Sequence, residues 1–286
     1  MDGTIVVGFD DTPQSAAAAH WAAGEARRRG VPLDILQAWP WHEPHVLGSY
    51  DAVQWARQRL AGRLVELRAE FPGVEVDAAQ LPEDAADALE AAGRTAVMLV
   101  LGSRGLGAVR GFLVGSVSHR VLGRAACPVV LVRTDDADSA ATSAAREVVL
   151  ALDPHRPGDR VTAFAFESAA LRSAPLRAVH AWDPPAGSEY MAFAALGSLD
   201  AELEAAARRG LAEALEPWRK RYPQVRVETR TPRGPAPVAV VEAAAGAGLV
   251  VVGRHTRRSP VGPHLGAVTR AVVHHVQGPV AVVPCG

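Results

Sequence analysis

The most chemically suggestive residues of this chain are glycines with the spacing Gly102-x2-Gly105-x9-Gly115-Ser116. Glycine lets the backbone turn with positive φ and approach a ligand closely, and successive amide N–H groups in such a turn can form a nest for an anion. Ser116 begins a predicted helix, whose N-terminus adds unpaired N–H donors and a partial positive charge. The spacing therefore predicts a phosphate-binding loop.

Side chains in and around this loop could strengthen the site. Arg104 and Arg110 could add charge-assisted contacts, and Ser116 could cap the helix or donate its hydroxyl to a phosphate. The loop lacks the Gly-Lys-Ser/Thr of a Walker loop, and Gly105-x-Gly107-x-x meets Arg110, so the dinucleotide fingerprint is broken too. A merely flexible loop with Ser116 as a routine cap is the alternative. The position of the Gly102–Ser116 loop between a buried strand and a helix favours phosphate binding.

Strands and helices must alternate to position this loop. In the first half, apolar β-branched runs predict strands, and apolar residues at helical spacing predict the helices between them. The order indicates an α/β fold with a doubly wound, five-stranded parallel sheet, Rossmann-like in class. Such sheets bind ligands outside the carboxyl ends of their strands where the winding reverses, here after Phe9 and after Leu101. The predicted strands are 5–9, 33–39, 74–79, 97–101 and 129–132, and the predicted helices 15–29, 52–70, 83–92 and 116–126.

The second half repeats the first. Asp153 follows Asp10 by 143 positions, and Gly253 follows Gly102 by 151, so the second copy carries an insertion. The stretch between the copies is rich in Asp, Ser and Ala, which is typical of a linker. We therefore expect two tandem domains of the same fold, residues 1–136 and 145–286.

Composition narrows the class of protein. Hydrophobic residues make up 49% of the 286 residues and charged residues 21%, as in a globular chain with a sizeable core. A net charge of −1 gives no basic face for nucleic acid, and the apolar runs are far shorter than the ~20 residues that span a bilayer. Two cysteines form no disulfide framework. The expectation is a cytoplasmic protein that partners neither nucleic acid nor membrane.

Three segments together resemble the universal stress protein family, and the resemblance covers both halves. They are Val7-Gly8-Phe9-Asp10 followed by Ser15, the glycine motif, and Cys127-Pro128-Val129-Val130-Leu131-Val132. The resemblance implies an adenine nucleotide α-hydrolase-like fold that binds ATP, with Mg²⁺ as a possible companion. It also implies pairing of the two domains through their last strands, Val129–Val132 with Val280–Val283, and a possible homodimer.

The same resemblance assigns roles to individual residues. It places Asp10 near the adenine or a metal, the backbone around Ala38 at the base, and Val117 and Ser118 at the phosphates. The predicted nucleotide-binding residues are Gly8, Asp10, Ala38, Gly102, Ser103, Arg104, Gly105, Leu106, Gly107, Ala108, Gly115, Ser116, Val117 and Ser118.

The second half keeps Asp153, Gly253 and Gly266 as weaker candidates, but its loop is degenerate. Thr256 stands at the place of Gly105, where a β-branched residue would be strained if φ must be positive. Ala267 replaces Ser116 and so removes a hydroxyl that could cap the helix. Pro260 and Pro263 each remove a backbone N–H donor from the loop. We expect weaker binding or none there, although the positive charge of Arg254, His255, Arg257 and Arg258 could still hold an anion.

No catalytic residue and no metal site are predicted. Phosphoryl transfer usually needs a cation on the phosphates, a held metal and a positioned nucleophile, yet the only lysine, Lys220, falls in a predicted surface helix. The segment His42-Glu43-Pro44-His45 offers three zinc ligands where a structural site needs four. Asp10 and Asp11 could hold Mg²⁺ on a nucleotide or cap the first helix, and for Asp11 the cap is favoured. A regulatory or sensor protein is favoured, with a slow ATPase, a nucleotidyl or phosphoryl transferase, or a nucleotide-free scaffold as alternatives.

Overall fold

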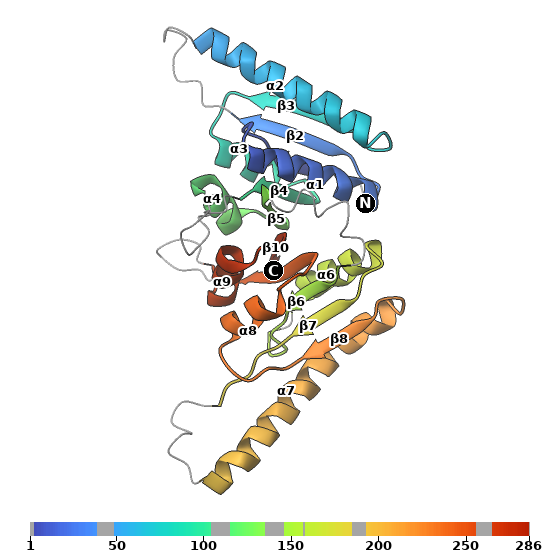
Figure 1. Ribbon diagram of the computed structural model, residues 1–286, viewed down its shortest axis with the longest axis vertical. Coiled ribbons are helices and arrows are strands. Elements are labelled where there is room, and N and C mark those ends of the chain that lie inside the picture. The colour runs from blue at the N-terminus through green and yellow to red at the C-terminus, as the bar shows by residue number, and fades with distance from the viewer. Residues whose placement is uncertain are drawn as a thin grey trace. The chain divides into compact units, whose positions relative to one another are not determined.

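The computed structural model describes residues 3–38, 49–103, 115–134, 146–156, 158–184, 193–255 and 265–285. The described residues form two compact units, the first within 3–134 and the second within 146–285. Each unit is a parallel sheet with helices packed on it (Figure 1).

The first unit has five parallel strands in the order β3-β2-β1-β4-β5. The chain winds outward from β1 through β2 to β3, then returns to β4 on the other side of β1, so the winding reverses between β1 and β4. Its elements are β1 (Ile5–Gly8), α1 (Pro13–Arg29), β2 (Leu33–Ala38), α2 (Ser49–Glu70), β3 (Val76–Leu81), α3 (Ala85–Ala92), β4 (Met98–Gly102), α4 (Ser116–Arg124) and β5 (Val129–Val132).

The second unit repeats this topology, with parallel strands in the order β8-β7-β6-β9-β10. Its winding therefore reverses between β6 and β9. Its elements are β6 (Val148–Ala151), α6 (Asp159–Leu171), β7 (Leu176–Val179), α7 (Phe193–Arg221), β8 (Val227–Arg230), α8 (Ala236–Ala243), β9 (Leu249–His255), α9 (Ala267–His275) and β10 (Val280–Cys285).

The apolar pattern of the sequence explains the core of each unit. Ile5 of β1 and Leu99 of β4 are fully buried, as expected of central strands whose two faces are covered by helices. Helix α1 buries Trp21 and the alanines at helical spacing from it. In α2, Leu60 and Leu67 are buried. The predicted fold class is confirmed, and within the described residues no helix is long and apolar enough to cross a membrane.

Candidate functional site

A cavity of about 130 Å³ lies in the first unit at the carboxyl ends of β1, β2 and β4, where the sheet's winding reverses. The starts of α1, α3 and α4 complete its wall. This volume is below the ~300–1,000 Å³ typical of small-molecule sites. Six of the predicted site residues line it: Gly8, Asp10, Ala38, Gly102, Val117 and Ser118.

The remaining predicted residues of the first unit are placed differently. Ser103 is buried beside the cavity, and its Oγ has no hydrogen-bond partner within the described ranges. Gly115 and Ser116 are exposed at the start of α4. Arg104, Gly105, Leu106, Gly107 and Ala108 lie outside the described residues, as do His42, Glu43 and His45.

The cavity also has an apolar wall that the sequence analysis did not anticipate. Leu36 of β2, Leu101 of β4, and Ala85 and Leu89 of α3 line it. In the sequence these residues have the spacing of ordinary core positions, so nothing local marks them as site residues. A flat aromatic or apolar group would find contacts on this wall, while the polar residues lie at the helix starts.

A tight turn carries Asp10 into the cavity. Its Oδ1 accepts hydrogen bonds from the Thr12 backbone N–H at 3.2 Å and from the Thr12 hydroxyl at 2.6 Å. Thr12 is the N-cap of α1, and its Oγ1 accepts from the Ser15 N–H at 3.2 Å. The turn thus fixes Asp10 and the start of α1 together.

The prediction that Asp11 caps the first helix is wrong. Asp11 lies in the left-handed region at φ 63°, whereas an N-cap residue adopts an extended backbone, as Thr12 does. The Asp11 carboxylate instead accepts from Nε of Arg59 on α2, at 2.9 and 3.1 Å to its two oxygens. This hydrogen-bonded ion pair raises the pKa of the Arg59 guanidinium.

Gly102 is required by packing between β4 and α1. A Cβ at this position would lie 2.6 Å from the Gln14 carbonyl carbon and 2.8 Å from the Ser15 nitrogen. Both atoms are backbone, so only glycine lets the first turn of α1 come this close to the end of β4.

The start of α4 differs from the prediction. Gly115 is the N-cap, and no side chain caps the helix, so Ser116 is already the first helical residue and does not serve as a cap. For the same reason Ala267 removes no cap from the second unit, because Gly266 is the N-cap of α9. Within the part of the chain that the structure describes, no side chain accepts from the first amides of α4. Free amides of this kind receive anions at helix starts.

The equivalent region of the second unit is built from different side chains. Asp153 Oδ1 accepts from the His155 N–H at 3.0 Å, as Asp10 does from Thr12. The Thr269 hydroxyl donates to the Gly253 carbonyl at 2.8 Å. Its counterpart Ser118 lines the first cavity, and the Ser118 hydroxyl makes no hydrogen bond within the described residues.

In this region of the second unit, burial shifts the pKa values of two titratable groups. Burial lowers the pKa of His180, against the attraction of the Asp153 carboxylate. Burial also raises the pKa of the Cys285 thiol, against the nearby Arg254. Both shifts favour the neutral side chain. Thr256, Arg257, Arg258, Pro260 and Pro263, on which the expected weakness of this loop rested, lie outside the described residues.

Comparison with known proteins assigns the family. The sequence model of the universal stress protein family matches residues 1–133 and again residues 145–284. A universal stress protein of Mycolicibacterium smegmatis is 33% identical, and the match covers 98% of this chain and 96% of that protein. The chain belongs to the universal stress protein family, and its two matches confirm the tandem repeat.

A solved structure shows the same fold over nearly the whole chain. The crystal structure of a universal stress protein from Archaeoglobus fulgidus DSM 4304 superposes with a TM-score of 0.72 at 17% identity, covering 99% of this chain and 98% of that one. A universal stress protein from Archaeoglobus fulgidus in complex with dAMP is 26% identical, covers 45% of this chain and 96% of its own, and has a TM-score of 0.37. The nucleotide is bound to that protein.

Proposed function

We propose that the first unit binds ATP and that the chain acts as a regulatory or sensor module of the stress response in the cytoplasm. The observation that carries this proposal is the cavity at the β1–β4 switch point, flanked by the starts of α1 and α4, because nucleotides bind α/β sheets at such points. The exposed start of α4, with no side-chain cap, is a suitable place for phosphates.

The lining suggests how the nucleotide is held. The apolar wall of Leu36, Leu89 and Leu101 suits the faces of an adenine ring, next to the backbone at Ala38. The Ser118 hydroxyl can donate to a phosphate oxygen. Asp10 is exposed and offers one carboxylate, which fits Mg²⁺, since this ion usually takes one or two carboxylates and completes its shell with phosphates and water.

Binding rather than turnover is proposed as the source of function. The only lysine of the chain, Lys220, lies on α7 of the second unit and pairs with Glu216 at 3.2 Å. Among the described residues, the cavity lining holds one ionisable side chain, Asp10, whose Oδ1 already accepts two hydrogen bonds. We expect ATP hydrolysis far below the ~1–10³ s⁻¹ of typical enzymes, and turnover in that range would refute the regulatory assignment.

Assembly is part of the same proposal. Pairing of the two domains through their last strands, as the family resemblance implies, would join the two nucleotide regions in one body, and a homodimer could follow. ATP would then act by changing conformation or assembly. Size-exclusion chromatography with and without ATP tests this point.

Substitution of Gly115 by valine gives the sharpest test of the ATP site. A Cβ at Gly115 meets no atom within 4 Å among the described residues, so the fold should survive, while the branched side chain blocks close approach of phosphate to the amides of α4. We expect ATP affinity in titration calorimetry to fall more than about tenfold, which is roughly 1.4 kcal/mol.

Gly266→Val is the matched control, because Gly266 occupies the same position before α9 and is equally open. It should leave the tight site of the first unit unchanged. Unchanged affinity in Gly115→Val would refute the site, and two equal tight sites per chain would refute the expected weakness of the second unit.

A further inference from the structure

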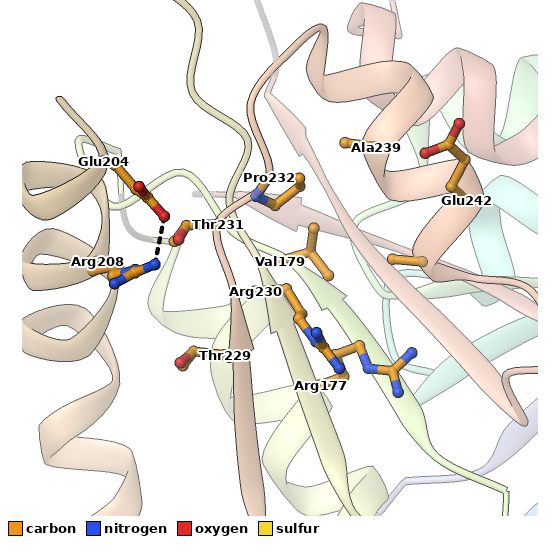
Figure 2. A pocket seen from close by; sticks show the side chains of 11 residues that line it. Arg177, Val179, Glu204, Arg208, Thr229, Arg230, Thr231, Pro232, Ala239 and Glu242 are labelled. Atoms are coloured by element: carbon orange, nitrogen blue, oxygen red, sulfur yellow. Dashed lines mark hydrogen bonds and ion pairs between the residues drawn. The ribbon is translucent and has the colours of Figure 1, made fainter. Parts of the chain in front are cut away.

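A second cavity, of about 590 Å³, lies in the second unit along β7 and β8, and residues of α7 and α8 line it from opposite sides of these strands. Figure 2 shows Glu204 and Arg208 of α7 on one side, Ala239 and Glu242 of α8 on the other, and Arg177 and Arg230 on the strands between them. We call this cavity the arginine groove. Its volume falls within the ~300–1,000 Å³ typical of small-molecule sites.

The arginine groove is separate from the region equivalent to the first unit's cleft. That region would be formed by Asp153, Gly253 and Thr269, the counterparts of Asp10, Gly102 and Ser118, and none of the three lines the groove. Among the described residues that line the groove, only Val179 has a counterpart, Leu36, that lines the first unit's cavity. The groove therefore does not belong to the ATP site proposed above.

Three arginines, Arg177, Arg208 and Arg230, line the groove, and two of them form ion pairs with carboxylates. Arg177 Nη1 lies 2.9 Å from Glu147, and Arg208 pairs with Glu204 one turn away on α7. A guanidinium has five donors, so these single pairs leave others available. The Arg177 Nε is buried and lacks a hydrogen-bond partner among the described residues.

Arg230 is exposed, and its side chain makes no hydrogen bond or ion pair within the described parts of the chain. The strand register places Arg230 beside Val179, two residues after Arg177 on β7. Neighbours in register on parallel strands point to the same face of the sheet. The two guanidinium groups therefore occupy one face.

The fold itself does not require this positive charge. In the first unit Asp34 stands where the second has Arg177, and Ala79 where it has Arg230. Arg57, the counterpart of Arg208, donates to Gln80 at 3.0 Å. The same architecture is stable with an acidic and a neutral residue at these two positions, so the two arginines of the second unit call for a chemical explanation.

We propose that the arginine groove binds a small phosphate ester that carries hydroxyl groups, such as a sugar phosphate. Planar guanidinium groups match the oxygen geometry of phosphate and bind it through paired hydrogen bonds, and Arg177 and Arg230 supply them. The Glu242 carboxylate can accept hydrogen bonds from ligand hydroxyls, while Val179 and Ala239 contact its carbon atoms. Thr229 alternates with Arg230 along β8 and points to the opposite face of the sheet.

Ribose 5-phosphate is the probe for a calorimetric titration of the intact chain, with ribose and inorganic phosphate as separate arms. Ribose 5-phosphate should bind, and each fragment alone should bind at least about tenfold more weakly. Absence of binding at roughly 10 mM probe would overturn the proposal. Equal affinity for inorganic phosphate would show that the groove does not recognise the sugar part of the ligand, and would overturn that part of the proposal.

Arg230→Gln should weaken binding about tenfold or more without affecting folding, because the side chain is exposed. Arg177→Gln should do the same, and its melting temperature checks that loss of the Glu147 pair has not unfolded the unit. The controls are Arg57→Gln, at the first unit's counterpart of Arg208, and Arg226→Gln, which is exposed and pairs with Glu228.

Both control variants should bind within about twofold of the natural chain. An Arg230→Gln variant that behaves like them would overturn the groove assignment. Gly115→Val separates this proposal from the ATP proposal, because it should weaken ATP binding and leave ribose 5-phosphate binding unchanged.

Discussion

The two units share a topology but differ where the turn after the first strand meets the long helix. In the first unit Arg59 of α2 donates to Asp11 in that turn. In the second unit the counterparts are Gly210 of α7 and Pro154, and a Cβ at Gly210 would lie 3.6 Å from the proline ring. An ion pair in one copy is thus replaced by close packing in the other.

This exchange changes the backbone that the turn can adopt. Asp10 and Asp153 both accept the N–H two residues later, so the hydrogen bond that closes the turn is retained. Asp11 is held at φ 63°, a region that costs a non-glycine residue about 1–2 kcal/mol. Pro154 is restricted to φ near −65°. The first unit therefore keeps a strained residue beside its proposed site, as functional sites often do.

The largest expected effect concerns Gly102, which ends β4, and its counterpart Gly253 in β9. Gly102→Ala forces its Cβ against the backbone of Gln14 and Ser15, whereas Gly253→Ala meets the Cys285 Sγ at 2.8 Å and a Val161 methyl at 3.3 Å. Side chains can shift and backbone in a helix start cannot, so Gly102→Ala should cost about 3 kcal/mol or more and Gly253→Ala about 1 kcal/mol. Urea unfolding of each unit measures the difference.

The double variant Gly253→Ala/Cys285→Ala provides the control, since removal of the sulfur should recover part of the loss. Equal destabilisation by Gly102→Ala and Gly253→Ala would show that the two helix starts are equally close to their sheets.

The effect of intermediate size is the difference in stability between a glycine and an alanine variant in each turn, which should have opposite signs in the two units. At position 11 the backbone has positive φ, so Asp11→Gly should be more stable than Asp11→Ala by about 1 kcal/mol. At position 154 proline sets a negative φ, so Pro154→Ala should be more stable than Pro154→Gly by about 0.4–1 kcal/mol. Thermal melts of the four variants test this, and the same order at both positions would contradict the difference between the turns.

The smallest effect concerns pH. Because burial lowers the pKa of His180 in the folded chain, the unfolded chain binds more protons just below the ordinary histidine pKa. This contribution to stability is therefore complete above about pH 6.5 and is lost as the pH falls through the folded pKa. His180→Gln, which installs the residue found at the equivalent Gln37, should make the unfolding free energy less dependent on pH between about 7 and 5.

Chemical denaturation of His180→Gln and the natural chain at several pH values measures this slope. His274→Gln, in the last turn of α9, is the comparison variant. An unchanged slope in His180→Gln would remove His180 as the source of the pH dependence.

The position of the cleft was predictable because its signals are local. The strand and helix periods extend over short stretches of sequence, and the glycines where β4 ends and α4 begins, Gly102 and Gly115, are 13 residues apart. The repeat of the pattern after 143 to 151 positions also predicted the two tandem folds. The predicted residues Gly8, Asp10 and Gly102 line the cavity for this reason, since the carboxyl ends of parallel strands share one edge.

Local patterns could not assign the helix caps, because backbone angles decide them. Asp11, Thr12 and Ser116 are all chemically able to cap a helix. Only the backbone shows that Thr12 caps α1, that Asp11 is left-handed, and that Gly115 rather than Ser116 is the N-cap of α4. A one-residue shift is enough to change which side chain faces the free amides.

The sequence by itself determined the order of elements, the duplication and the edge of the sheet where a ligand would bind, because hydrophobic period and glycine spacing are encoded over short distances. Only the tertiary structure decided that Arg59 reaches Asp11 across 48 residues and that Arg177, Arg208 and Arg230 line one groove. Those contacts depend on strand register and on where each helix crosses the sheet, which are fixed by packing of the whole unit.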